Sequence, residues 1–115
     1  MQKIKKMTNI RTIVLMLALM VIPSAAIAAE KYMSLLDQID KALTSRDWAM
    51  SEHLIKTALE MKPANPSNYL LMSNLGTVYR NQGKLDESLE NYNMALSVAP
   101  KSTTILHNRA ALYLE

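Results

Sequence analysis

A pattern that occurs twice at a fixed distance constrains the fold of this chain more than any other feature. Four pairs of matching positions lie 37 residues apart: Ser51 and Ser88, Ile55 and Tyr92, Ala58 and Ala95, and Pro63 and Pro100. Self-similarity at such a period is typical of stacked supersecondary units, none of which can bury its apolar face alone. The sequence therefore predicts a repeat protein.

The second copy of the pattern predicts two helices joined by a turn, because apolar residues recur every three or four positions on both sides of Gly83. We expect the first helix to begin at Pro66 with Asn65 as its cap. Gly83 suits the left-handed position that ends a helix, and Pro100 should stop the second helix. Small residues are expected where the two helices cross closely: Gly76, Ser88 and Ala95.

The order and spacing of these residues resemble the tetratricopeptide consensus. The matching stretch is Leu75-Gly76-x-x-Tyr79, followed by Ser88, Tyr92, Ala95 and Pro100. Residues 69–102 form one full 34-residue repeat. The resemblance implies an all-α fold, a short α-α solenoid of helical hairpins.

A degenerate repeat precedes this one at residues 32–65. There Arg46 stands where glycine usually permits a left-handed turn, which would cost about 1 kcal/mol if that geometry persists. Residues 103–115 match the first helix of a third, incomplete repeat, with Leu106, Ala110 and Tyr113 in phase. Because such arrays normally close with a polar capping helix, we expect the chain to be a fragment of a longer protein.

The N-terminal segment, residues 1–28, has the three parts of a secretory signal peptide. Basic residues precede an apolar stretch at residues 13–22, and Pro23 ends that stretch. Ala26-Ile27-Ala28 then provides the small residues that a signal peptidase needs, so we predict cleavage after Ala28 and a periplasmic or secreted location. An uncleaved anchor is the alternative, although about 15 Å of helix is half of the roughly 30 Å hydrocarbon layer.

The positive charge of the chain belongs to the predicted leader. The formal net charge is +3, but four of the thirteen basic residues and none of the ten acidic residues lie in residues 1–28. Nine basic and ten acidic residues remain, a net charge of −1. Bulk charge therefore gives no support to nucleic-acid binding.

Catalytic and cofactor chemistry find no support in the sequence. Cysteine is absent, the two histidines His53 and His107 lie on different repeats, and two glycines cannot form a phosphate-binding loop. We predict that the chain is not an enzyme and that it holds no metal or cofactor.

The family resemblance implies a concave groove, lined by the first helix of each hairpin, where a peptide or partner helix docks. Carrying the usual groove positions onto this sequence gives Met33, Leu36, Asp40, Leu43 and Thr44 in the first repeat, Leu70, Ser73, Thr77, Arg80 and Asn81 in the second, and Thr104, His107 and Ala111 in the third. A subgroup of the family clamps a peptide C-terminus with lysines and asparagines. Asn74 and Asn108 occupy one asparagine position, but Ser73 and His107 replace the lysine, so the sequence argues against that clamp.

These observations favour a non-catalytic interaction module or scaffold of the bacterial cell envelope that binds a protein or peptide partner. Two alternatives remain at this point: the N-terminal helical part of a larger exported enzyme or transporter-associated protein, and a membrane-anchored assembly factor if the leader is retained. The sequence does not determine the oligomeric state.

Overall fold

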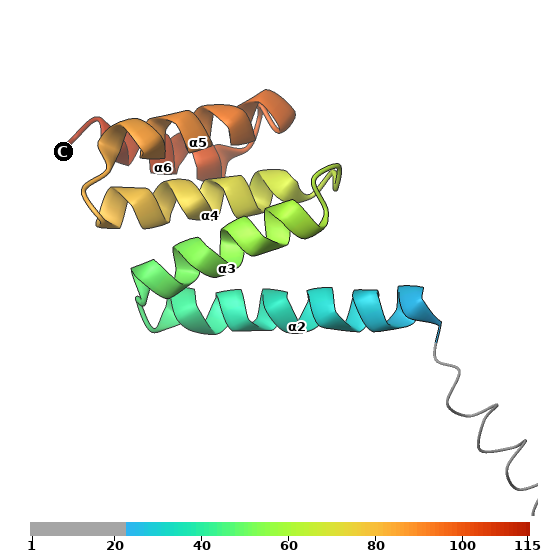
Figure 1. Cartoon of the computed structure of the whole chain (residues 1–115). Coiled ribbons are helices and arrows are strands. Elements are labelled where there is room, and N and C mark those ends of the chain that lie inside the picture. Colours follow the sequence, from blue (N-terminus) through green and yellow to red (C-terminus); the bar gives the residue numbers. More distant parts are fainter. Residues whose placement is uncertain (1–22) are drawn as a thin grey trace, which may run out of the picture. The chain divides into compact units, whose positions relative to one another are not determined.

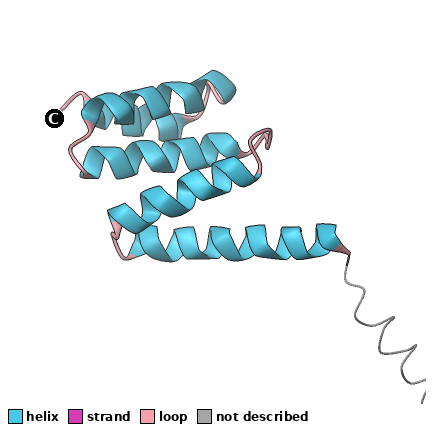
Figure 2. Ribbon diagram, viewed as in Figure 1, coloured by secondary structure: helices cyan, strands magenta, loops and turns pink. Residues whose placement is uncertain are grey.

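The computed structural model describes residues 23–115, so most of the predicted leader lies outside the described residues. Within 23–115 every regular element is an α-helix (Figures 1 and 2), which confirms the all-α prediction. The helices are α2 (Ser24–Thr44), α3 (Trp48–Met61), α4 (Asn68–Asn81), α5 (Leu85–Val98) and α6 (Thr103–Leu112). None of these described helices combines the length and the apolar character that a bilayer-spanning helix needs.

The chain divides into two compact units, of which the first ends at Lys31 and the second comprises Tyr32–Glu115. In the described part of the first unit, the Pro23 carbonyl accepts hydrogen bonds from the amides of Ala26 and Ile27 and so opens α2.

Side-chain caps fix the start of two helices. The Asp47 carboxylate accepts a hydrogen bond from the Met50 amide (3.1 Å) at the start of α3, and the Ser102 hydroxyl accepts one from the Ile105 amide (3.4 Å) at the start of α6. Each cap satisfies a backbone donor that has no partner inside its own helix. Asp86 and Glu87 lie in the first turn of α5, where their charge favours the helix dipole.

The predicted start of α4, at Pro66, is wrong by two residues. Pro66 is not helical, and α4 begins at Asn68. The Asn65 carboxamide oxygen accepts from the Ser67 amide (3.0 Å), so Asn65 stabilises a turn before the helix and does not cap it. Asn68 anchors that turn from the other side, because its side-chain amide donates to the Lys62 carbonyl (2.8 Å).

Equivalent turns close both hairpins. Gly83 has a φ of +76°, as predicted, and the Lys84 amide reaches back to the Tyr79 carbonyl (2.8 Å). Arg46 has a φ of +57°, and the Asp47 amide reaches the Ala42 carbonyl at 2.9 Å. The first hairpin therefore keeps the left-handed turn without the glycine that this geometry favours.

The crossing of α4 and α5 depends on small residues, as the sequence predicted. A Cβ atom on Gly76 would lie 2.7 Å from the ring of Tyr92, closer than real side chains approach. The fully buried Ser88 hydroxyl donates to the Gly76 carbonyl at 2.6 Å. Glycine at position 76 thus lets a tyrosine ring lie directly against the α4 backbone.

Two apolar clusters form the core of the second unit. The larger joins α2, α3 and α4 and consists of Tyr32, Leu35, Ile39, Ile55, Ala58, Leu71, Leu75, Val78 and Tyr79. The smaller joins α5 and α6 and consists of Tyr92, Ala95, Leu96, Ile105 and Leu112. Tyr69 and Met72 of α4 pack against this second cluster, so α4 contributes to both.

The expected apolar side of the last helix is not its buried side. Ile105 and Leu112 are buried, whereas Leu106 is 38% exposed and Tyr113, just beyond the helix, is 67% exposed. In the preceding repeat, α5 packs over the corresponding side of α4, and no described helix follows α6 to do the same. The core contacts of α6 are therefore made by Ile105 and Leu112 and not by the residues in consensus phase.

Candidate functional site

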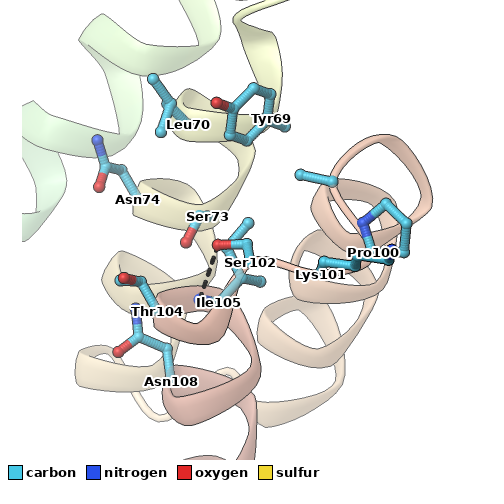
Figure 3. A pocket seen from close by; sticks show the side chains of 11 residues that line it. Tyr69, Leu70, Ser73, Asn74, Pro100, Lys101, Ser102, Thr104, Ile105 and Asn108 are labelled. Carbon is cyan, nitrogen blue, oxygen red and sulfur yellow. Dashed lines mark hydrogen bonds between the residues drawn. The ribbon is translucent and has the colours of Figure 1, made fainter.

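A hollow of about 730 Å³ lies between α4, α6 and the loop that joins α5 to α6 (Figure 3). Helix α4 contributes Tyr69, Leu70, Ser73 and Asn74, the loop contributes residues 99–102, and α6 contributes Thr104, Ile105 and Asn108. The lining of the hollow combines apolar side chains with hydroxyl and amide groups. Such a mixture suits a polypeptide, which presents backbone polar groups and side chains together.

The internal repeat places the two walls of the hollow. Helices α4 and α6 are the first helices of successive hairpins, and their lining residues match at 34-residue spacing: Leu70 with Thr104, and Asn74 with Asn108. Buried Ile105 anchors α6 in the core, and the Ser102 cap fixes its first turn. Both walls are therefore rigid helices.

Ser73 places a hydroxyl at the hollow. The residue is only 7% exposed, and its hydroxyl makes no hydrogen bond to any other residue within 23–115. Figure 3 shows Ser73 on α4, near the start of α6. The fully buried side-chain atoms without a partner in the described residues are Asn68 Oδ1 and Gln82 Oε1, so the Ser73 oxygen is accessible and can bond to a ligand group.

Some asparagine side chains are bonded within the protein, and others remain available to a ligand. The described part of the chain contains seven, and five of them make side-chain hydrogen bonds within the protein: Asn65, Asn68, Asn81, Asn91 and Asn93. Asn74 and Asn108 make no side-chain hydrogen bond to another described residue, and both line the hollow. Their amides are free to bind a ligand.

Three of the predicted groove residues line the hollow: Leu70, Ser73 and Thr104. Three others are held by internal bonds. Thr77 bonds to the Tyr92 hydroxyl (2.8 Å), Asn81 donates to the Thr77 carbonyl (2.8 Å), and Arg80 donates to the Asn108 carbonyl (3.4 Å) and pairs with Glu115 (3.7 Å).

The remaining predicted positions lie outside the hollow. Leu36 and Leu43 pack against the larger core cluster. Ala111 is half-buried, and the others are exposed: Met33, Asp40, Thr44 and His107. The structure thus gathers the second- and third-repeat positions nearest the start of each helix and leaves those of the first repeat apart from them.

The loop residue Lys101 was missed by the sequence reasoning, which carried over only helix positions. It lines the hollow together with Pro100 and Ser102. One signal could have drawn attention to it: the equivalent position of the first repeat, 37 residues earlier, is Ala64.

A second, more open hollow of about 540 Å³ lies along α5 and is lined by Asp86, Leu89, Glu90, Asn93, Met94 and Ser97. It lacks a buried free polar group, since Asn93 already accepts from Arg109 at 2.9 Å. No cluster of three or more metal-ligating side chains occurs among residues 23–115.

Comparisons with known proteins agree with this architecture. The tetratricopeptide repeat family model matches residues 70–102. A crystal structure of a tetratricopeptide repeat protein from Parabacteroides merdae ATCC 43184 is similar, with 44% sequence identity and a TM-score of 0.70. No curated protein sequence matches the chain.

The similarity to that structure covers 74% of this chain and 33% of the other, so the present sequence spans about a third of the length of its relative. The helical hairpins, the glycine at the helix crossing and the two matches all agree. The chain belongs to the tetratricopeptide repeat family.

Proposed function

We propose that this chain is a non-catalytic protein-binding module that holds an extended segment of a partner protein in the hollow between α4 and α6. Tetratricopeptide repeats in general mediate protein–protein interaction. The observation that carries the proposal for this chain is the pair of free amides on Asn74 and Asn108, which stand one repeat apart on the two walls of the hollow.

A carboxamide matches a peptide backbone well because it offers a donor and an acceptor at once. Packed helices lie about 8–10 Å apart, and an extended chain rises about 3.3 Å per residue. The two amides would therefore engage backbone groups about three residues apart. The Ser73 hydroxyl lies beside Asn74 on the same wall, and the exposed Leu70 supplies apolar contact for side chains.

The proposal is tested with peptides selected for binding to the full chain from a random nonapeptide phage library. Fluorescence polarisation then compares their affinity for the wild-type chain, for the double variant Asn74→Ala/Asn108→Ala and for Asn93→Ala. Two lost hydrogen bonds at about 0.5–1.5 kcal/mol each predict at least a five- to ten-fold weaker Kd for the double variant.

The Asn93→Ala control has the same chemistry but lies in the second hollow, along α5. We expect it to leave the Kd unchanged. If Asn93→Ala weakens binding and the double variant does not, the partner binds along α5 and the proposed site is wrong. Circular dichroism of each variant confirms that the helices are intact.

We also propose that the module acts outside the cytoplasm, in the cell envelope. The support is the sequence pattern of residues 1–28, with its basic start, apolar stretch and Ala26-Ile27-Ala28. N-terminal sequencing of the protein from fractionated cells should begin at Ala29. Recovery of the uncleaved N-terminus in the membrane fraction would contradict cleavage and favour a retained anchor.

A further inference from the structure

Lys101 is the one charged side chain among the lining residues of the hollow, and no acidic residue lines it. Lys101 is exposed and forms no salt bridge within the described part of the chain. The position 37 residues earlier holds Ala64, in a longer connection between helices. Its charge is available to a ligand.

The start of α6 adds to the positive potential. The first turn of this helix contains no acidic residue, so its partial positive charge is not neutralised there. Thr104 of this turn lines the hollow together with Lys101. The Ser73 hydroxyl, which has no partner among residues 23–115, offers a hydrogen-bond donor to the same space.

The first repeat carries the opposite charge. The positions in α2 that correspond to Asn74 and Thr77 are Asp37 and Asp40, and both are exposed. An acidic group on a bound segment would be repelled by these carboxylates and attracted by Lys101. The charges therefore favour one location for such a group, at the α5–α6 loop.

We propose that the hollow selects partner segments with an acidic side chain, a glutamate or aspartate within an extended stretch, through Lys101 and the unneutralised start of α6. This inference rests on the proposed function, since it names the chemistry of the segment that the same hollow binds. The side chain is favoured over a chain terminus because Asn74 and Asn108 stand on successive helices, where a segment would continue past both.

The test uses the full chain, immobilised, and pools of nonapeptides with acetylated and amidated ends. The central residue is fixed as Glu, Gln or Lys, and the flanking positions are random among uncharged residues. Mass spectrometry measures the retention of each pool. For an exposed ion pair we expect the Glu pool to be retained about two- to five-fold better than the Gln pool at low salt. The preference should shrink as salt rises.

Variants at Lys101 assign the effect to this residue. Lys101→Gln should make the Glu and Gln pools equal, and Lys101→Glu should favour the Lys pool. Lys41→Gln changes the net charge equally on α2 and should keep the Glu preference, and the basic leader is the same in every variant. A Glu preference that persists in Lys101→Gln, or a wild-type chain without any preference, would overturn the inference.

Two further comparisons separate the possible failures. A Gln pool with a free C-terminal carboxylate, if retained better than its amidated form, would show that the hollow reads a chain terminus and overturn the side-chain assignment. If all pools bind equally but less well to Asn74→Ala/Asn108→Ala, this inference fails while the proposed function stands. If the wild-type chain retains no pool better than that double variant, both fail.

Discussion

Replacing Arg46 with glycine should stabilise this protein. Arg46 has a φ of +57°, a backbone conformation in which the Cβ atom of an L-residue clashes with the following carbonyl oxygen. Relief of that strain contributes about 1–2 kcal/mol. The greater backbone freedom of glycine in the unfolded chain offsets about 0.5–1 kcal/mol. The middle of these two ranges leaves a net gain in the free energy of unfolding of about 0.5–1 kcal/mol.

The chain contains its own control for this change. Gly83 has the corresponding conformation 37 residues later, and a Cβ atom added there would meet nothing within 4 Å. Gly83→Arg should therefore lose about 0.5–1 kcal/mol, which is the backbone strain less the entropy that glycine contributes to the unfolded chain, without a steric clash. Arg46→Ala keeps the Cβ atom and should change stability by a few tenths of a kcal/mol at most, because the side chain is exposed.

Urea and thermal unfolding followed by circular dichroism measure these differences. For a unit of this size, the expected gain for Arg46→Gly corresponds to a rise in Tm of about 2–8 °C. Two results would refute the reasoning. One is a lower Tm for Arg46→Gly, and the other is an equal rise for Arg46→Ala, which would attribute the effect to the guanidinium group and not to the backbone.

Two further substitutions test how the hairpins are held. Gly76→Ala should lower the free energy of unfolding by about 1–3 kcal/mol, because the new Cβ atom would lie 2.7 Å from the Tyr92 ring. Urea unfolding measures this loss. A loss no larger than that of Gly83→Ala would contradict the close crossing of α4 and α5. Ser102→Ala removes the cap of α6 and should cost about 1 kcal/mol, seen as faster amide hydrogen exchange confined to α6. Equal acceleration in α3, which has its own cap at Asp47, would instead indicate global unfolding.

The features that the sequence predicted correctly depend on single residues with strong local preferences. Gly83 adopts the left-handed turn, and Gly76 and Ser88 lie at the close crossing of α4 and α5. At the crossing only small residues fit, and at the turn glycine adopts a positive φ without strain, so these residue types indicate the local geometry. Where local chemistry allows two outcomes, the prediction failed: Asn65 and Pro66 could have started a helix but form a turn.

The hollow was only partly predictable, because it depends on which side chains are left without internal partners. Thr77, Arg80 and Asn81 have residue types as suitable for binding as those of Asn74 and Asn108. Only the folded arrangement shows that their side chains are already bonded within the protein. Thr77 bonds to Tyr92, Arg80 to the Asn108 carbonyl and Asn81 to the Thr77 carbonyl of its own helix. Spacing identifies a surface, whereas hydrogen-bond satisfaction identifies its free groups.

Helix α4 links the stability of the fold to the geometry of the site. Gly76 and Ser73 are one helical turn apart, and Gly76 contacts α5 while Ser73 lines the hollow opposite α6. The approach of α5 to α4 is set by the Tyr92 ring against Gly76, and the end of α5 leads directly into the loop that carries Lys101. A substitution that separates α4 from α5 would therefore also shift Lys101 relative to Asn74. Because packed interiors transmit such displacements, we expect a side chain at position 76 to change the spacing between the charge and the amides of the hollow.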